Sequence, residues 1–244
     1  MKHTNLIKAK MIGLKLTLVI FAFLSFTHAA FAQEDEEEPV KEEEPVKAGP
    51  EKIPEFKRSI RACFKLPNAI ANQAFKKVFN GISNLEVGFT QPISKNFYVG
   101  ANIQHGYYDI NRYSFAEVSN GKMMTAFAFG EVGVQKYWSP RWYWTFNVRA
   151  GFGNVWIKTE NCGPEPKTKS MLYTEEQFGI YLWANERMSY GMLVSHQLLH
   201  FAFHPGYICR TSFGGLFPED WAGPSHSFTI GFGFTCLLGK EFKE

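Results

Sequence analysis

Residues 121–158 read as a long β-hairpin with a tight break at residues 138–141. In its second half, apolar side chains dominate alternate positions from Trp142 to Trp156, and polar residues or glycines dominate the positions between them. This period of two is typical of a strand with one apolar face and one polar or small face. About seventeen residues give roughly 55 Å of extended chain, two to three times the length of an ordinary strand. Long alternating strands joined by tight turns are what a membrane-spanning β-barrel requires.

The same alternation recurs over residues 59–240 and predicts an all-β membrane fold, an eight-stranded antiparallel up-and-down transmembrane β-barrel. Further clear strands are 85–90, 97–104, 172–182, 188–200 and 228–235. In 125–137 the parity is less clean, and we expect the small apolar set to face outward. The weakest strand, Ser59 to Lys65, would pair with the last one and close the barrel. Short breaks after about residues 92, 137 and 184 alternate with longer connections at 66–81, 111–120, 159–169 and 202–224, as in outer-membrane barrels.

The segments outside the barrel are expected to be a signal peptide, an arm and a tail. Residues 1–32 combine four lysines, an apolar run from Leu16 to Phe26 and a small-x-small site at Ala30-Phe31-Ala32, which predicts a cleaved signal peptide. Residues 33–58 repeat Glu-Glu-Glu-Pro-Val-Lys and predict an acidic, disordered periplasmic arm. Residues 241–244 form a short C-terminal tail. The formal charge of +3 includes the four leader lysines, so it gives no reason to expect nucleic-acid binding.

The two faces of the strands predict different surroundings. Tryptophans at the strand ends, which are Trp142, Trp144, Trp156 and Trp183, are expected on the lipid-facing side as an interfacial girdle. An eight-stranded barrel is just wide enough to be filled by its own side chains. We therefore expect the inward charges to form one hydrogen-bonded network in a polar lumen. Its predicted members are Arg61, Lys65, Glu86, Glu131, Arg149 and Glu175. Such a network would suit a structural plug or a proton or solute pathway, and a soluble β-protein with the apolar face inward is the alternative fold.

The first long connection carries a helical pattern rather than a strand pattern. From Asn68 to Asn80, apolar residues recur at three- and four-residue spacing, with Lys76 and Lys77 on another face. This predicts an amphipathic helix in the first outer loop. The helix would cap the barrel mouth, or its apolar face, with Ile70, Phe75 and Phe79, would contact a partner or the outer leaflet.

Cysteines and histidines add few candidates for chemistry. Cys162 and Cys209 both fall in long outer loops, where an exported chain can form a disulfide. Cys63 should face the lumen and Cys236 the lipid, near opposite ends of neighbouring strands, so this pair is not expected to bond. His196, His200 and His204 recur every four residues, which on a strand indicates interfacial packing. Neither a metal nor another cofactor is expected.

A lipid hydrolase is the enzymatic alternative, with Ser195-His196 or Ser225-His226-Ser227 as its candidates. Adjacent residues on a strand point to opposite faces, however, so neither pair is arranged for catalysis. The sequence therefore favours a protein that is not an enzyme.

The leader, the strand alternation, the rhythm of short turns and long loops and the Phe228–Phe234 terminal strand together resemble small gram-negative outer-membrane β-barrel proteins. The similarity is to the OmpX/OmpW-like, outer-membrane β-barrel-domain group and covers about residues 59–240. It implies a location in the cell outer membrane, with both termini in the periplasm and lipid and lipopolysaccharide around the barrel. A filled lumen, a periplasmic acidic arm and an outer amphipathic helix favour a structural or accessory subunit of an envelope complex, with other outer-membrane or periplasmic proteins as its partners. The resemblance suggests secretion, surface export or barrel assembly as the setting. A narrow channel for small solutes is the alternative.

Overall fold

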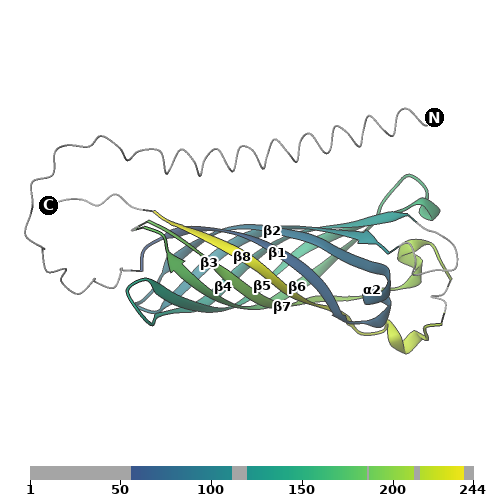
Figure 1. The fold of residues 1–244 in the computed structure, drawn as a ribbon. Coiled ribbons are helices and arrows are strands. Elements are labelled where there is room, and N and C mark those ends of the chain that lie inside the picture. Colours follow the sequence, from purple (N-terminus) through teal and green to yellow (C-terminus); the bar gives the residue numbers. More distant parts are fainter. Residues whose placement is uncertain (1–55, 112–119, 186, 212–214, 239–244) are drawn as a thin grey trace, which may run out of the picture. The chain divides into compact units, whose positions relative to one another are not determined.

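The computed structural model describes residues 56–111, 120–185, 187–211 and 215–238, and their strands form a closed antiparallel barrel (Figure 1). The strands are β1 (Ser59–Ala71), β2 (Phe79–Pro92), β3 (Phe97–Ile110), β4 (Gly121–Tyr137), β5 (Trp142–Thr159), β6 (Lys167–Trp183), β7 (Met188–Ala202) and β8 (Pro224–Leu237). Each strand pairs with the next one along the chain. The predicted eight-stranded up-and-down barrel is confirmed. The signal peptide, arm residues 33–55 and the tail lie outside the described residues.

The barrel closes between its first and last strands. Pairing of β1 with β8 begins at Ser59 and Leu237, passes through Lys65 and Gly231, and ends at Ala71 and His226. The ladder between β1 and β2 stops at Lys65 and Asn84, two residues before Pro67, which has no N–H to donate. Closure leaves no exposed sheet edge, as a strand structure in lipid requires.

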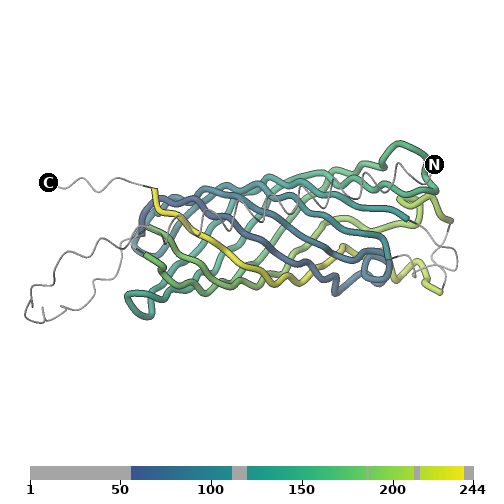
Figure 2. The backbone as a smooth tube through the Cα atoms, turned by 45° about the horizontal axis from the view of Figure 1, so that its top comes forward, coloured from purple at the N-terminus to yellow at the C-terminus, as the bar shows by residue number. Residues whose placement is uncertain are grey.

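The two ends of the barrel differ in their connections (Figure 2). Short turns at 93–96, 138–141 and 184–187 lie at one end, called the turn end here, where β1 begins and β8 ends. The other end, the loop end, carries helix α2 (Gln73–Val78) and the connections 111–120, 160–166 and 203–223. These connections include the short 3-10 helices η2 (Glu160–Cys162), η3 (Pro205–Ile208) and η4 (Pro218–Asp220). The alternation of short and long connections follows the predicted rhythm.

The barrel is apolar outside and charged inside. Phe152, on the outward face of β5, is 72% exposed, whereas Arg149, on the inward face of the same strand, is fully buried. Each strand contributes at least one large apolar side chain to the exterior, so this surface is suited to lipid rather than water. On β4 the outward apolar positions run from Met124 to Val134, about 33 Å of strand. At a tilt of about 40° this gives a band of about 25 Å, the height found in transmembrane barrels.

The first strand and the first helix differ from the prediction. β1 continues past Lys65 to Ala71, because Asn68 and Ala69 pair with β8. The helix is therefore restricted to Gln73–Val78 rather than 68–80. Tertiary pairing overrides the local helical pattern in this segment.

Within the described ranges, no helix is both long and apolar enough to cross a membrane.

Candidate functional site

The middle of the lumen is filled by a charge network, named here for the six side chains that form it. Arg61 and Lys65 come from β1, Glu86 from β2, Glu131 from β4, Arg149 from β5 and Glu175 from β6. All six residues are at most 3% exposed. Each lies at an inward position of an alternating strand, and the structure brings them together. The three cations balance the three carboxylates, which lowers the cost of burying charge.

Arg149 is the centre of the charge network. Its Nε donates to Glu131 at 2.9 Å, and its Nη1 donates to Glu86 at 2.9 Å and to Glu175 at 3.0 Å. Only a planar guanidinium with several N–H donors can reach three carboxylates in this way. Arg149 therefore ties β5 to β2, β4 and β6 across the lumen.

Lys65 and Glu175 extend the network toward the remaining strands. The Lys65 ammonium lies 2.6 Å from Glu86 and 2.8 Å from Glu175. Glu175 also accepts hydrogen bonds from Tyr173, from Gln197 on β7 and from Ser195, which in turn contacts Thr229 on β8. A single carboxylate thus accepts five donors, and its position is fixed from several sides.

Arg61 lies nearer the turn end and is held mainly by aromatic rings. Its guanidinium is 3.8 Å from Glu131, 5.3 Å from the Tyr98 ring centre and 5.9 Å from the Tyr181 ring centre. Beyond it, Tyr143, Tyr181 and Trp183 form a buried aromatic layer, in which the first two rings stack at 5.1 Å. Trp183 is therefore in the lumen, and its predicted place in the lipid-facing girdle is wrong. Its position follows the parity of Tyr181 and Gly179, which also face inward.

The loop-end half of the lumen is apolar, contrary to the expected polar lumen. Its buried cluster, the apolar plug, has as its largest members Phe75, Phe79, Tyr108, Phe127, Tyr173, Phe201 and Phe203. Smaller inward residues such as Val155, Ile157 and Met171 complete it. These side chains stand at inward positions near the loop ends of their strands. The inward positions of β5 change from polar or small residues to apolar ones after Gly153, and this change in the sequence was the signal that could have revealed the plug.

Helix α2 closes the apolar plug from the loop end. Phe75 is fully buried, and its ring lies 5.4 Å from Phe79 and 6.2 Å from Phe203. Asn72 caps the helix by accepting from the Phe75 N–H and also donates to the backbone of Gly223. Phe75 and Phe79 are therefore unavailable to a partner, which corrects the predicted contact site. Of the three residues proposed, only Ile70 is exposed, and it lies on the outside of β1.

The loop-end connections are joined by a disulfide between Cys162 and Cys209, whose Cα atoms are 5.3 Å apart. Cys63 is buried in the lumen and Cys236 is exposed, and both are free. Cys236 pairs with Ile60 at the same end of the barrel as Cys63. The two free cysteines are thus separated by the faces they occupy, not by lying at opposite ends.

The histidines lie on the outside, and the serines beside them lie inside. His196 and His226 stack with their ring nitrogens 3.0 Å apart, and His200 contacts Thr174. His204 lies beyond β7 and caps η3. Ser195 points into the charge network, so Ser195-His196 is divided between two faces. Among the described residues, no cluster of three His, Cys, Asp or Glu side chains could hold a metal ion.

Comparisons with known proteins identify the fold. No protein-family model matches the sequence, and no curated protein sequence matches it. Among solved structures, the chain is similar to Neisserial surface protein A, with 6% identity, 74% of this chain and 97% of that chain covered, and a TM-score of 0.52. Ail, the attachment invasion locus protein of Yersinia pestis, is 9% identical, with 74% and 99% covered and a TM-score of 0.42. OprG from Pseudomonas aeruginosa is 9% identical, with 78% and 100% covered and a TM-score of 0.41. The likeness shows the fold alone, that of the small outer-membrane β-barrels.

Proposed function

We propose that this protein is a non-enzymatic, non-conducting outer-membrane barrel that serves as a structural or accessory subunit of an envelope complex. In this proposal the loop end faces outward, and both termini lie in the periplasm. The main observation that supports this proposal is that side chains fill the lumen. The apolar plug, the charge network and the aromatic layer follow one another along the axis, and every strand except β8 contributes a member to at least one of them. A barrel filled in this way acts through its surfaces rather than through a pore.

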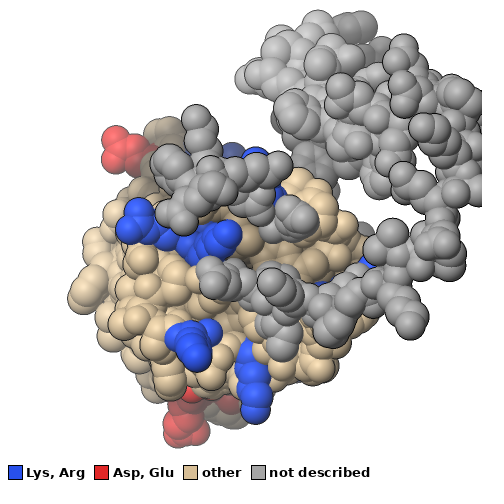
Figure 3. Space-filling view, turned by 90° about the vertical axis from the view of Figure 1, so that its left-hand side faces the viewer, with Lys and Arg blue, Asp and Glu red and all other residues tan. Residues whose placement is uncertain are grey.

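The turn end offers a surface for a periplasmic partner. Figure 3 looks onto this end and shows lysine and arginine side chains spread across it. The exposed basic residues there are Lys57, Arg58, Lys95, Lys136, Arg141 and Arg187. In the described part of the chain, no exposed acidic residue lies at this end. The surface therefore suits an acidic face of another envelope protein, which it would attract by electrostatic steering.

The first test is the native mass of the protein after gentle detergent extraction, with mass spectrometry of what co-purifies. We expect a stoichiometric envelope protein that is lost in the double variant Lys95→Glu/Arg141→Glu. The matched control is Lys76→Glu, which changes an exposed lysine at the loop end. A lone barrel in its micelle, for wild type as for the variants, would contradict the subunit proposal.

Planar bilayers test the channel alternative. We expect no discrete conductance steps from the wild-type protein, because the apolar plug and the charge network leave no continuous polar path. Steps that recur with purified wild-type protein and change size in Arg149→Met would contradict this expectation and place the narrow channel first.

A further inference from the structure

The lipid-facing surface is not uniformly bulky. On β8 the outward positions carry Phe228, Ile230, Phe232 and Phe234. On β4 the corresponding positions carry Ala126, Ala128 and Gly130. Small residues on one strand between larger ones on its neighbours leave a depression in the exterior of the barrel.

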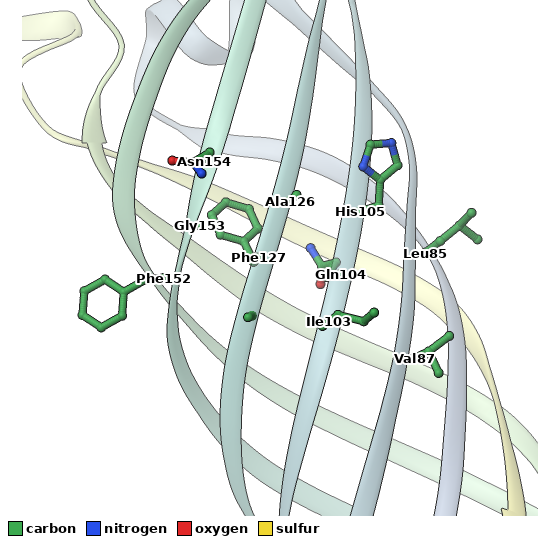
Figure 4. A pocket seen from close by; sticks show the side chains of 11 residues that line it. Leu85, Val87, Ile103, Gln104, His105, Ala126, Phe127, Phe152, Gly153 and Asn154 are labelled. Atoms are coloured by element: carbon green, nitrogen blue, oxygen red, sulfur yellow. The ribbon is translucent and has the colours of Figure 1, made fainter.

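This depression is an apolar groove along β4 (Figure 4). Phe152 on β5 stands on one side, and Leu85 and Val87 on β2 stand on the other, with Ile103 on β3 between them and the floor. Its central part has a volume of about 590 Å³. Toward the turn end it continues over Ala101 and Ala150. Because neighbouring strands are about 4.8 Å apart, β3 and β5 stand about 10 Å apart across β4, wide enough for one acyl chain.

The groove leads to a basic site at its loop end. There it is lined by His105, Lys122, Met124, Trp156 and Lys158, with no acidic side chain. Lys122 and Lys158 are directly paired on β4 and β5, and both are exposed. Among the described residues, neither ammonium lies within 4.0 Å of a carboxylate. Asp109 on β3 is paired directly with Lys122, so Lys122 has one acidic and one basic neighbour across its two ladders. Glu160 follows β5 and accepts a hydrogen bond from Asn120.

We propose that this groove binds one lipid A molecule, with an acyl chain over Ala126 and Ala128 and a sugar phosphate at Lys122 and Lys158. Lys122 lies just beyond the apolar band that starts at Met124, which is the level of the lipid head groups. Lipid A carries phosphates directly on an acylated disaccharide, so paired lysines above an acyl groove complement its charge and shape. Trp156 suits the same interface. The inference rests on the proposed orientation, since lipid A belongs to the outer leaflet.

The test is a titration of delipidated, full-length protein in mild detergent with lipid A, with the bound fraction read by native mass spectrometry. We expect one lipid A per barrel. Lys122→Ala and Lys158→Ala should each weaken binding about fivefold, and the double variant about twenty-fivefold. Lys136→Ala, at the other end of β4, is the matched control and should bind like wild type.

A second pair of variants tests the acyl groove itself. Ala128→Phe fills the floor and should abolish saturable binding, whereas Val132→Phe, outward on the same strand but below the groove lining, should not. The heat-dependent gel shift of a folded barrel shows whether each variant has assembled, and the lysine variants still test the proposal if Ala128→Phe does not.

Three results would overturn the inference: equal lipid A binding by all variants, groove-dependent binding of phosphatidylglycerol in place of lipid A, or a groove-dependent mass that is a second copy of this chain. The second result would also indicate the opposite orientation. A missing partner or a conducting lumen would contradict the proposed function without changing lipid A binding, so the two failures are distinguishable.

Discussion

At the residue scale, Arg149 is the side chain on which most of the lumen depends. It contacts three carboxylates that have few other cationic partners, since Lys65 reaches two of them and Arg61 lies 3.8 Å from the third. The net stabilisation from a buried ion pair is small, but removal of one partner leaves charge buried without compensation. The network should therefore respond strongly to the loss of a single cation.

We expect Arg149→Met to lower the free energy of unfolding by about 3–5 kcal/mol. The measurement is urea unfolding in detergent micelles, followed by tryptophan fluorescence. Lys136→Met, which removes an exposed cation from the neighbouring strand, should change stability by less than about 0.5 kcal/mol. Equal effects of the two substitutions would show that the network contributes nothing specific.

Gly100 tests how closely the lumen is packed. A Cβ atom at this inward position would lie 2.7 Å from the Glu131 carboxylate and 2.7 Å from the Phe89 carbonyl oxygen. We expect Gly100→Ala to cost about 1–3 kcal/mol, because the backbone contact cannot relax easily. Gly130 lies at an outward position of β4, opposite Ala101, and a Cβ there would meet nothing closer than 3.8 Å. Gly130→Ala should be neutral or slightly stabilising in the same unfolding measurement, and a loss as large as that of Gly100→Ala would contradict this account.

At the scale of elements, the loop end is built as a cap. Helix α2 supplies Phe75 to the apolar plug, and Asn72 hydrogen-bonds the backbone of the β7–β8 connection. Phe203 and Ile208 from that connection enter the same cluster. The β1–β2 and β7–β8 connections therefore stabilise each other over the lumen, although each contains little regular secondary structure.

The disulfide should stabilise these connections more than the barrel. Since β6 and β7 are already paired, the Cys162–Cys209 bond adds little constraint to the strands themselves. We expect Cys162→Ser/Cys209→Ser to speed proteolysis within residues 203–223 several-fold while the urea midpoint of the barrel changes little. Cys236→Ser, which removes an exposed free thiol, is the control. A large fall in the barrel midpoint would contradict this division.

At the scale of the whole molecule, polarity is reversed relative to a water-soluble protein. Six charged side chains occupy the interior, while the exterior of the strands is apolar over about 25 Å. This arrangement is stable only where lipid surrounds the barrel, because the outer surface is too apolar for water. The two ends remain distinct, since the turn end is basic and the loop end is capped.

Labelling of single cysteines tests the proposed orientation. In a Cys236→Ser background, Glu219→Cys at the loop end should react with a membrane-impermeant maleimide on intact cells. Ser94→Cys, in a short turn, should react only after the outer membrane is permeabilised. Both positions are exposed, so access from the outside is the only variable. The opposite pattern would place the loops in the periplasm.

The sequence by itself determined the fold of the barrel and the residues that face its lumen. A period of two assigns each side chain to one face, and the lengths of the connections give the order of short turns and long loops. The positions of Arg149 and Glu175 on the inward face followed from this parity alone. Periodicity is a local property of the chain, so it can be read without knowledge of tertiary contacts.

Tertiary structure decided what each inward side chain meets. Asn68 to Ala71 became strand because β8 offered them hydrogen-bonding partners, although their spacing favoured a helix. Phe75 is buried because the mouth of the barrel provides apolar neighbours. Trp183 keeps the inward parity of β6, and the closed sheet places it against Tyr143 of β5. The groove along β4 depends on three strands that are adjacent only in the closed sheet. These features arise from contacts between distant segments, which the alternation within one strand does not specify.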